Sequence, residues 1–173
     1  MREVANADGI RSFMRALGQA AMSPGRVLFT GGATAVLIGW RETTIDIDIK
    51  LVPDQDTILR AIPALKESLH LNVELASPDD FIPVREGWMD RSPFVAQEGR
   101  LTFYHFELVA QALAKIERGH AQDLADVHEM LDRGLVSVEQ LRAEFQAIEP
   151  QLYRYPAIDP VAFARAVEAI VNG

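Results

Sequence analysis

The stretch FTGGATAVLIGWRETTIDIDIKL, Phe29–Leu51, decides the fold because it joins a glycine pair to a strictly alternating segment. Gly31 and Gly32 separate one short apolar run, Val27–Phe29, from a second, Ala33–Ile38. Glycines between two apolar runs favour a tight turn. The sequence therefore predicts a strand, a turn and a helix in succession.

From Ile45 to Leu51, apolar and polar residues alternate without exception, which predicts a strand with one buried face. Asp46 and Asp48 then share a face, with α-carbons about 7 Å apart. Two such carboxylates can bind one hard cation or a close pair of Mg²⁺ ions, which share oxygen ligands with phosphates. The alternative is a solvated strand with ordinary surface charges. Aspartate is disfavoured in strands and like charges on one face repel, so the pattern favours a functional site.

These residues resemble a known signature. Gly31-Gly32, thirteen intervening residues and Asp46-Ile47-Asp48-Ile49 look like the G-[GS]-x(about ten)-D-x-D signature of the DNA-polymerase-β-like nucleotidyltransferase superfamily. More narrowly, Thr30–Ala35 and Arg41–Thr44 are similar to small bacterial minimal nucleotidyltransferases and AbiEii-type toxin domains. The resemblance continues through Leu113–Arg118 and Asp123–Val127, so that it covers about residues 27–135.

The resemblance implies a metal-dependent enzyme that moves a nucleoside monophosphate from an NTP to an acceptor hydroxyl on RNA such as tRNA, on a protein or on a small molecule. Its cofactor would be Mg²⁺ or Mn²⁺. The implied catalytic residues are Asp46, Asp48, Glu74 and Lys115, and the implied metal ligands are Asp46, Asp48 and Glu74. The implied nucleotide-binding residues are Gly31, Gly32, Thr34, Arg41, Lys115, Asp123 and Asp126.

Other functions stay open from the sequence. The chain could be a catalytically inactive module of the same fold that binds a partner, such as the cognate toxin or antitoxin of a toxin–antitoxin system. It could also be an aminoglycoside-type enzyme with a small-molecule acceptor. Labelled NTPs, offered with RNA, protein and small-molecule acceptors, distinguish these classes.

Several of the implied residues have ordinary structural explanations. Glu74 shares a strand face with Asn72 if Val73 and Leu75 point to the core, and it could be a solvated glutamate. Lys115 could be a surface lysine instead. If it contacts phosphate, Lys115→Met should spare stability and reduce NTP affinity or turnover, because methionine keeps most of the apolar stem and lacks the charge. Asp123 and Asp126 lie on one helical face, near a helix start that favours negative charge. Arg41 could equally form a surface salt bridge.

The composition describes a folded chain of 173 residues with 49% apolar residues and no cysteine. Thiolate metal sites and disulfides are therefore excluded. The length predicts one domain. Within it, the resemblance implies a nucleotidyltransferase-like core at about residues 8–135, followed by a helical extension at about 136–173. The formal net charge of −8 argues against broad electrostatic attachment to nucleic acid or anionic lipid. The chain shows neither a signal peptide nor a membrane span, so we expect a cytoplasmic protein.

Periodicity and capping residues predict an α+β fold, with a small mixed sheet flanked by helices and a helical C-terminal part. Asp8 is expected to cap the first helix, and Pro63 to kink the helix ending at Ser68 or split it in two. The other expected elements are a strand at 71–75, a hairpin at 95–106, helices at 106–118 and 122–133, one opened by a capping box at Ser137, and a last one capped by Asp159.

Overall fold

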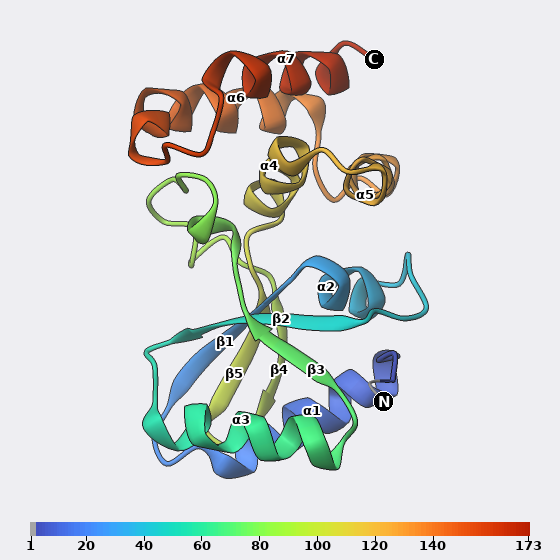
Figure 1. Ribbon diagram of the computed structural model, residues 1–173, viewed down its shortest axis with the longest axis vertical. Helices are drawn as coiled ribbons and strands as arrows, with labels where there is room; N and C mark the ends of the chain where they lie inside the picture. Colours follow the sequence, from blue (N-terminus) through green and yellow to red (C-terminus); the bar gives the residue numbers. More distant parts are fainter. Residues whose placement is uncertain (1–2) are drawn as a thin grey trace. The chain divides into compact units, whose positions relative to one another are not determined.

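The computed structural model describes residues 3–173, which form five strands and seven α-helices, with two short 3₁₀ helices (Figure 1). The strands are β1 Gly25–Thr30, β2 Asp46–Val52, β3 Asn72–Leu75, β4 Phe94–Glu98 and β5 Leu101–His105. The helices are α1 Ala7–Ala20, α2 Gly31–Ile38, α3 Asp56–Ser68, α4 Leu108–Arg118, α5 Ala121–Asp132, α6 Val138–Ile148 and α7 Pro160–Val171; the 3₁₀ helices are η1 Pro78–Asp80 and η2 Glu149–Arg154. None of the helices in this part of the chain is long and apolar enough to cross a membrane.

The strands form one mixed sheet in the order β3-β2-β1-β5-β4. β1 runs antiparallel to β2 and parallel to β5, while β3 runs parallel to β2. β4 and β5 form the expected hairpin. The mixed sheet, its flanking helices and the helical C-terminal part confirm the predicted α+β fold class.

The chain folds into two compact units. The first comprises the residues up to Ser77 together with Ser92–His105, and the second comprises Pro78–Arg91 and Phe106–Gly173. The first unit thus holds the whole sheet with α1, α2 and α3, and the second holds the other four α-helices. The expected single domain, with its core ending near residue 135, stays a prediction.

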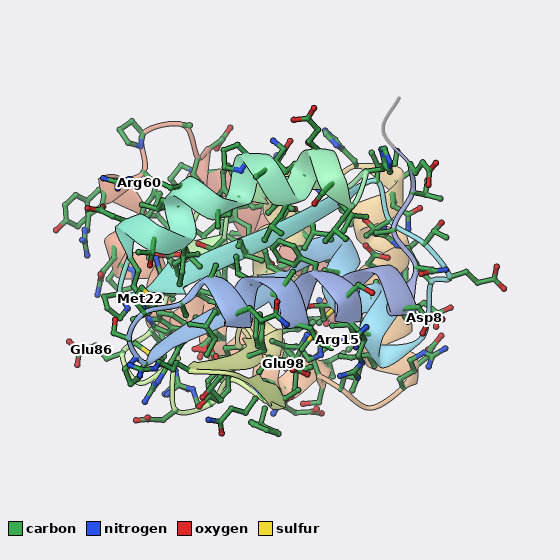
Figure 2. The ribbon with its side chains drawn as sticks, turned by 90° about the horizontal axis from the view of Figure 1, so that it is seen from below. Asp8, Arg15, Met22, Arg60, Glu86 and Glu98 are labelled. Carbon is green, nitrogen blue, oxygen red and sulfur yellow. The ribbon has the colours of Figure 1, made fainter. Side chains whose placement is uncertain are left out.

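In the first unit, α1 and α3 lie side by side over one face of the sheet (Figures 1 and 2). Apolar side chains on that face form the core, and they come from every second position of the strands, as in Val27, Phe29, Ile47, Ile49 and Phe103. The strand residues between them point to the opposite face, which carries Asp46, Asp48 and Lys50 of β2 and also the fully buried Leu28 of β1. The pleat of the sheet therefore places the predicted site residues Asp46 and Asp48 on the face opposite α1 and α3.

The predicted cap of α1 is wrong. Asn6, not Asp8, caps α1, since its side chain accepts a hydrogen bond from the Gly9 N–H at 2.8 Å. α3 is one helix that contains Pro63, so of the two outcomes expected there the split into two pieces is wrong, and a kink stays a prediction. An interior proline costs about 3 kcal/mol, but the buried side chains of Ile58 and Ile62 contribute about 1.5–3 kcal/mol each.

The second unit attaches its long segment Pro78–Arg91 to the helices through polar and aromatic contacts. Arg85 Nε donates to Glu144 of α6 at 2.6 Å, and Arg91 Nε donates to Glu107, the N-cap of α4. The Trp88 ring stacks on Phe106, with centroids 4.2 Å apart and planes 8° apart. Trp88 is therefore a packing residue. The predicted caps at Ser137 and Asp159 are also confirmed.

Candidate active site

The aspartate strand places two carboxylates on one face, as predicted. Burial alternates along β2, so that Ile47 and Ile49 are fully buried while Asp46 and Asp48 are half-buried on the other side. The antiparallel register with β1 puts Asp48 opposite Thr30, the residue that caps α2. The carboxylates therefore lie where the strand–turn–helix unit begins its helix.

Gly31 lies directly against the Asp48 carboxylate. Its φ is +62°, in the left-handed region that glycine adopts at little cost. A Cβ at this position would lie 3.2 Å from Asp48 Oδ2. Because Gly31 also begins α2, the positive end of the helix dipole adjoins this carboxylate. Such a helix start suits phosphate groups bound next to a carboxylate-held cation.

Gly32 has a different reason to be glycine. A Cβ there would lie 2.0 Å from Thr44 Oγ1 and 2.7 Å from Thr44 Cβ, with Arg41 Nη1 at 3.2 Å. Thr44 in turn donates to the Asp46 carbonyl at 3.0 Å. The loop before β2 therefore packs against the glycine turn, and the predicted nucleotide-binding residue Arg41 lies beside it.

Glu74 stands next to the aspartates through the parallel pairing of β3 with β2. Glu74 is opposite Asp48, and Asn72 is opposite Asp46. The Asn72 amide donates to Asp46 Oδ1 and, at 3.3 Å, to Glu74 Oε1. Leu75, expected to face the core, is exposed, so the alternation predicted for this strand fails at its last residue.

The donor set at this face suits a Mg²⁺ ion. Mg²⁺ is commonly held by one or two carboxylates together with substrate phosphates and water, and Asp46 and Asp48 supply such a pair. Between residues 3 and 173, no group of three or more histidine, aspartate or glutamate side chains is arranged to hold a metal ion. The role of Glu74 as a third ligand stays a prediction.

Thr34 lies inside the first unit, where His105 holds its side chain. Its Oγ1 is 3.0 Å from His105 Nδ1, and the two residues are 1% and 6% exposed. Burial, helped by the positive charge of Arg11, lowers the pKa of His105 to about 4. The imidazole is therefore neutral near pH 7, and its bond to Thr34 links the end of β5 to α2. Direct contact of Thr34 with nucleotide stays a prediction.

The remaining predicted site residues belong to the second unit, where Lys115 and Asp126 form a buried ion pair and the buried Asp123 pairs with the exposed Arg118. Lys115 is 7% exposed and its Nζ donates to Asp126 Oδ2 at 2.8 Å. Arg118 makes a two-point contact with Asp123, at 2.6 and 2.8 Å. Burial opposes the charge of Asp123, but the Arg118 hydrogen bonds and nearby Lys115 outweigh it and hold the pKa of that carboxyl below its ordinary value. The surface-lysine interpretation of Lys115 is therefore wrong.

A family comparison adds to this geometry. The family described as a nucleotidyltransferase of unknown function (DUF6036) matches residues 8–159. The chain belongs to this nucleotidyltransferase family. The matched range contains every residue predicted for the site, from Gly31 to Asp126. No curated protein and no solved structure matches the chain.

The candidate site also contains residues to which the sequence assigned no role. Thr44 packs against Gly32, and Asn72 bridges Asp46 and Glu74. The sequence could have indicated Asn72, because strand alternation places it on the same face as Glu74. The sequence could not have indicated Thr44, because the contact of Thr44 with Gly32 depends on how the loop between them folds.

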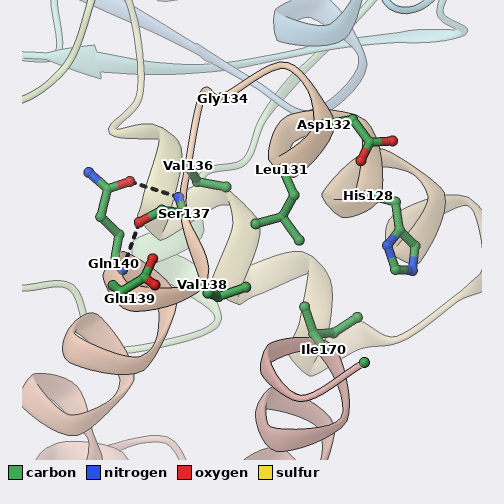
Figure 3. A pocket seen from close by; sticks show the side chains of 11 residues that line it. His128, Leu131, Asp132, Gly134, Val136, Ser137, Val138, Glu139, Gln140 and Ile170 are labelled. Carbon is green, nitrogen blue, oxygen red and sulfur yellow. Dashed lines mark hydrogen bonds between the residues drawn. The ribbon is translucent and has the colours of Figure 1, made fainter.

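An open hollow of about 730 Å³ lies in the second unit, between the end of α5 and the start of α6 (Figure 3). Leu131, Val136, Val138 and Ile170 give it apolar walls, and polar residues such as His128 and Glu139 surround them. Its lining includes none of the residues that the nucleotidyltransferase signature singles out. We therefore do not count it as part of the site.

We predict that Gly32→Ala lowers the free energy of unfolding by about 1–3 kcal/mol, because the added methyl group overlaps Thr44. Urea denaturation measures this. Gly9→Ala in α1 is the matched control, since the nearest atom to its new Cβ is 3.4 Å away. Adding Thr44→Gly should restore part of the loss. Equal stabilities of Gly32→Ala and the wild type would contradict the packing argument.

The buried His105 predicts a pH-dependent stability. Its pKa is about 4 in the folded state and near 6.5 in the unfolded state, so between these values only the unfolded chain takes up the proton. The contribution of neutral His105 to the free energy of unfolding is therefore fully present above about pH 6.5. It is lost as the pH drops to about 4, which lowers the free energy of unfolding by up to about 3 kcal/mol.

Urea denaturation of the wild type and His105→Gln across this pH range measures the effect. The difference between their unfolding free energies should change with pH, because glutamine does not titrate. The exposed His128, replaced by glutamine, serves as the control. Parallel pH profiles for wild type and His105→Gln would show that His105 is not the titrating group.

Proposed function

We propose that this protein is a Mg²⁺- or Mn²⁺-dependent nucleotidyltransferase, which transfers a nucleoside monophosphate from an NTP to an acceptor hydroxyl. One observation carries the proposal: Asp46 and Asp48 share a half-buried face, and Gly31 at the start of α2 lies against Asp48. Carboxylates for a cation and a helix start for phosphates are the two components that this reaction needs.

In the proposed reaction, the acceptor oxygen bonds to the α-phosphorus, the bond to the pyrophosphate oxygen breaks, and pyrophosphate leaves. The cation, when bound by Asp46 and Asp48, neutralises phosphate charge. Glu74 takes the acceptor proton, since it is exposed and opposite Asp48. Arg41, beside the glycine turn, contacts the leaving phosphates.

The finer family assignment is also part of the proposal. The glycine and aspartate signature supports membership of the DNA-polymerase-β-like superfamily, close to minimal nucleotidyltransferases and AbiEii-type toxin domains. By this resemblance, Lys115, Asp123 and Asp126 approach the triphosphate, and the protein acts in a toxin–antitoxin pair in the cytoplasm. Lys115 already forms a buried ion pair with Asp126. To contact the triphosphate, the Lys115 ammonium therefore has to leave Asp126 or bind a phosphate oxygen in addition to it.

The direct test is incubation of the purified protein with each α-labelled NTP, Mg²⁺ or Mn²⁺, and separate RNA, protein and small-molecule acceptors. Transfer of label to one acceptor class, with release of pyrophosphate, is the expected result. Metal-dependent NTP binding in calorimetry, without transfer to any acceptor, would contradict the enzymatic proposal while retaining the nucleotide site.

The second candidate is a catalytically inactive binding module of the same fold. It is favoured by Asn72, whose amide occupies the position between Asp46 and Glu74. In that case Asn72→Asp should strengthen metal binding, which isothermal calorimetry with Mn²⁺ measures. An active wild-type enzyme rules out this candidate.

A further inference from the structure

On the sheet face that carries Asp46 and Asp48, the side chains beyond Asp48 include cationic and aromatic residues rather than acidic ones. The next row across the strands consists of Lys50 on β2, Leu28 on β1, Tyr104 on β5 and Phe94 on β4, which stand opposite one another in register. This row is about 7 Å from Asp48 along β2, and Tyr104 is two strands, about 10 Å, away from β2. The row therefore lies within reach of a substrate whose reacting end is at Asp48.

Aromatic rings dominate the far half of this row. The Phe94 ring meets Tyr104 edge-on, with centroids 6.2 Å apart and planes at 83°. The guanidinium carbon of Arg26, one row further on β1, lies 5.8 Å from the centre of the Tyr104 ring. Phe94 is 63% exposed and Arg26 is exposed as well, while Tyr104 is half-buried. Phe94 and Arg26 are thus presented on the surface beside the half-buried Tyr104 ring, whereas Leu28, between Lys50 and Tyr104, is fully buried.

The charge of this half of the face is positive. Its positions on the described strands carry Lys50 and Arg26 and no carboxylate, whereas the adjoining half carries Asp46, Asp48 and Glu74. The chain's net charge of −8 is unevenly divided: the first unit has 9 lysines and arginines against 10 acids, and the second has 8 against 15. The unit that holds the site therefore does not repel a polyanion strongly.

We propose that Arg26, Lys50, Phe94 and Tyr104, the aromatic–cationic surface, bind a single-stranded nucleic acid whose terminal hydroxyl is the acceptor at Asp48. Bases stack on Tyr104 and Phe94, and Lys50 and Arg26 contact the backbone phosphates, the combination by which proteins bind single strands without reading their sequence. A protein acceptor without net charge would gain no electrostatic attraction from Lys50 and Arg26. The role of the terminal hydroxyl as acceptor rests on the proposed nucleotidyl transfer. The binding of the single strand does not.

Binding is tested by fluorescence anisotropy with a single-stranded RNA of about ten nucleotides, in the absence of NTP and metal. Tyr104→Leu and Phe94→Ser should each weaken binding about tenfold. Arg26→Gln should weaken it too, and should make the slope of log affinity against log salt shallower by about 0.7. The two aromatic variants should leave that slope unchanged.

The controls are Tyr153→Leu, an exposed tyrosine of the second unit, and Arg15→Gln on α1, which covers the other face of the sheet (Figure 2). Both should bind like the wild type. Melting temperatures show whether Tyr104→Leu is folded, and the exposed Phe94 supplies a variant with little effect on folding.

Three outcomes would overturn the proposal: no binding of single-stranded RNA by the wild type, equal affinity for duplex and single strand, or control variants as weak as Tyr104→Leu and Phe94→Ser. Failure of the nucleotidyl transfer itself is measured separately, by NTP calorimetry and label transfer. RNA binding that persists in Asp48→Asn would support this surface even in a protein without transferase activity.

Discussion

Asp48→Asn and Asp46→Asn are each expected to reduce metal-dependent nucleotidyl transfer about a thousandfold. The cation contributes several kcal/mol of charge stabilisation, and each 1.4 kcal/mol corresponds to about a factor of ten. The fold should stay intact, because two like charges on one strand face oppose folding rather than support it. Initial rates with saturating NTP, together with melting temperatures, measure both effects.

Asp54→Asn is the matched control for these variants. Asp54 is exposed just beyond the end of β2, so the same chemical change there removes a charge without touching the shared face. Its transfer rate should equal that of the wild type. If Asp46→Asn and Asp48→Asn kept wild-type transfer, the cation would have to be held elsewhere and the proposed site would be wrong.

Lys115→Met is expected to lower the free energy of unfolding by about 3–5 kcal/mol, because it removes the ammonium that pairs with the buried Asp126 carboxylate at 2.8 Å. This differs from the expectation from the sequence, in which Lys115→Met spares stability and lowers NTP affinity or turnover. Lys115→Met combined with Asp126→Leu should recover much of the loss, since an apolar pair can replace a buried ion pair. Urea denaturation measures both variants.

Arg133→Met provides the comparison at the surface. Arg133 pairs with Glu129 at 3.2 Å, but both side chains are largely exposed, so its removal should cost no more than about 0.5 kcal/mol. NTP affinity per folded molecule then separates the two roles of Lys115. Unchanged stability together with lost affinity would favour a purely nucleotide-binding lysine and contradict the buried-pair argument.

The elements around the glycine pair show what local pattern predicts well. The alternation from Ile45 to Leu51 placed Asp46 and Asp48 correctly, because the period of a strand fixes which side chains share a face. The caps at Ser137 and Asp159 could likewise be predicted, because their hydrogen bonds join residues close together in the chain. Asn6 was missed in favour of Asp8 because both are good caps, and only the backbone decides between neighbouring candidates.

Pro63 and Lys115 show where local pattern fails. The sequence allows a break at Pro63, but burial of Ile58 and Ile62 under the sheet keeps α3 in one piece. The local pattern leaves a surface position open for Lys115, because its partner, Asp126, lies eleven positions away on another helix. The packing of α5 against α4 brings the two charges together, and no spacing rule within one helix predicts that contact.

The sequence alone determined the strand–turn–helix–strand unit, the α+β class and the common face of Asp46 and Asp48, because these depend on periodicity and on residues close in the chain. Tertiary structure alone decided the contacts of Thr34 with His105, Gly32 with Thr44 and Arg26 with Tyr104. Each contact joins two segments that are brought together by the order of the strands or by the packing of a loop. The number of residues between the two segments does not predict such a contact, so these side chains meet only in the folded protein.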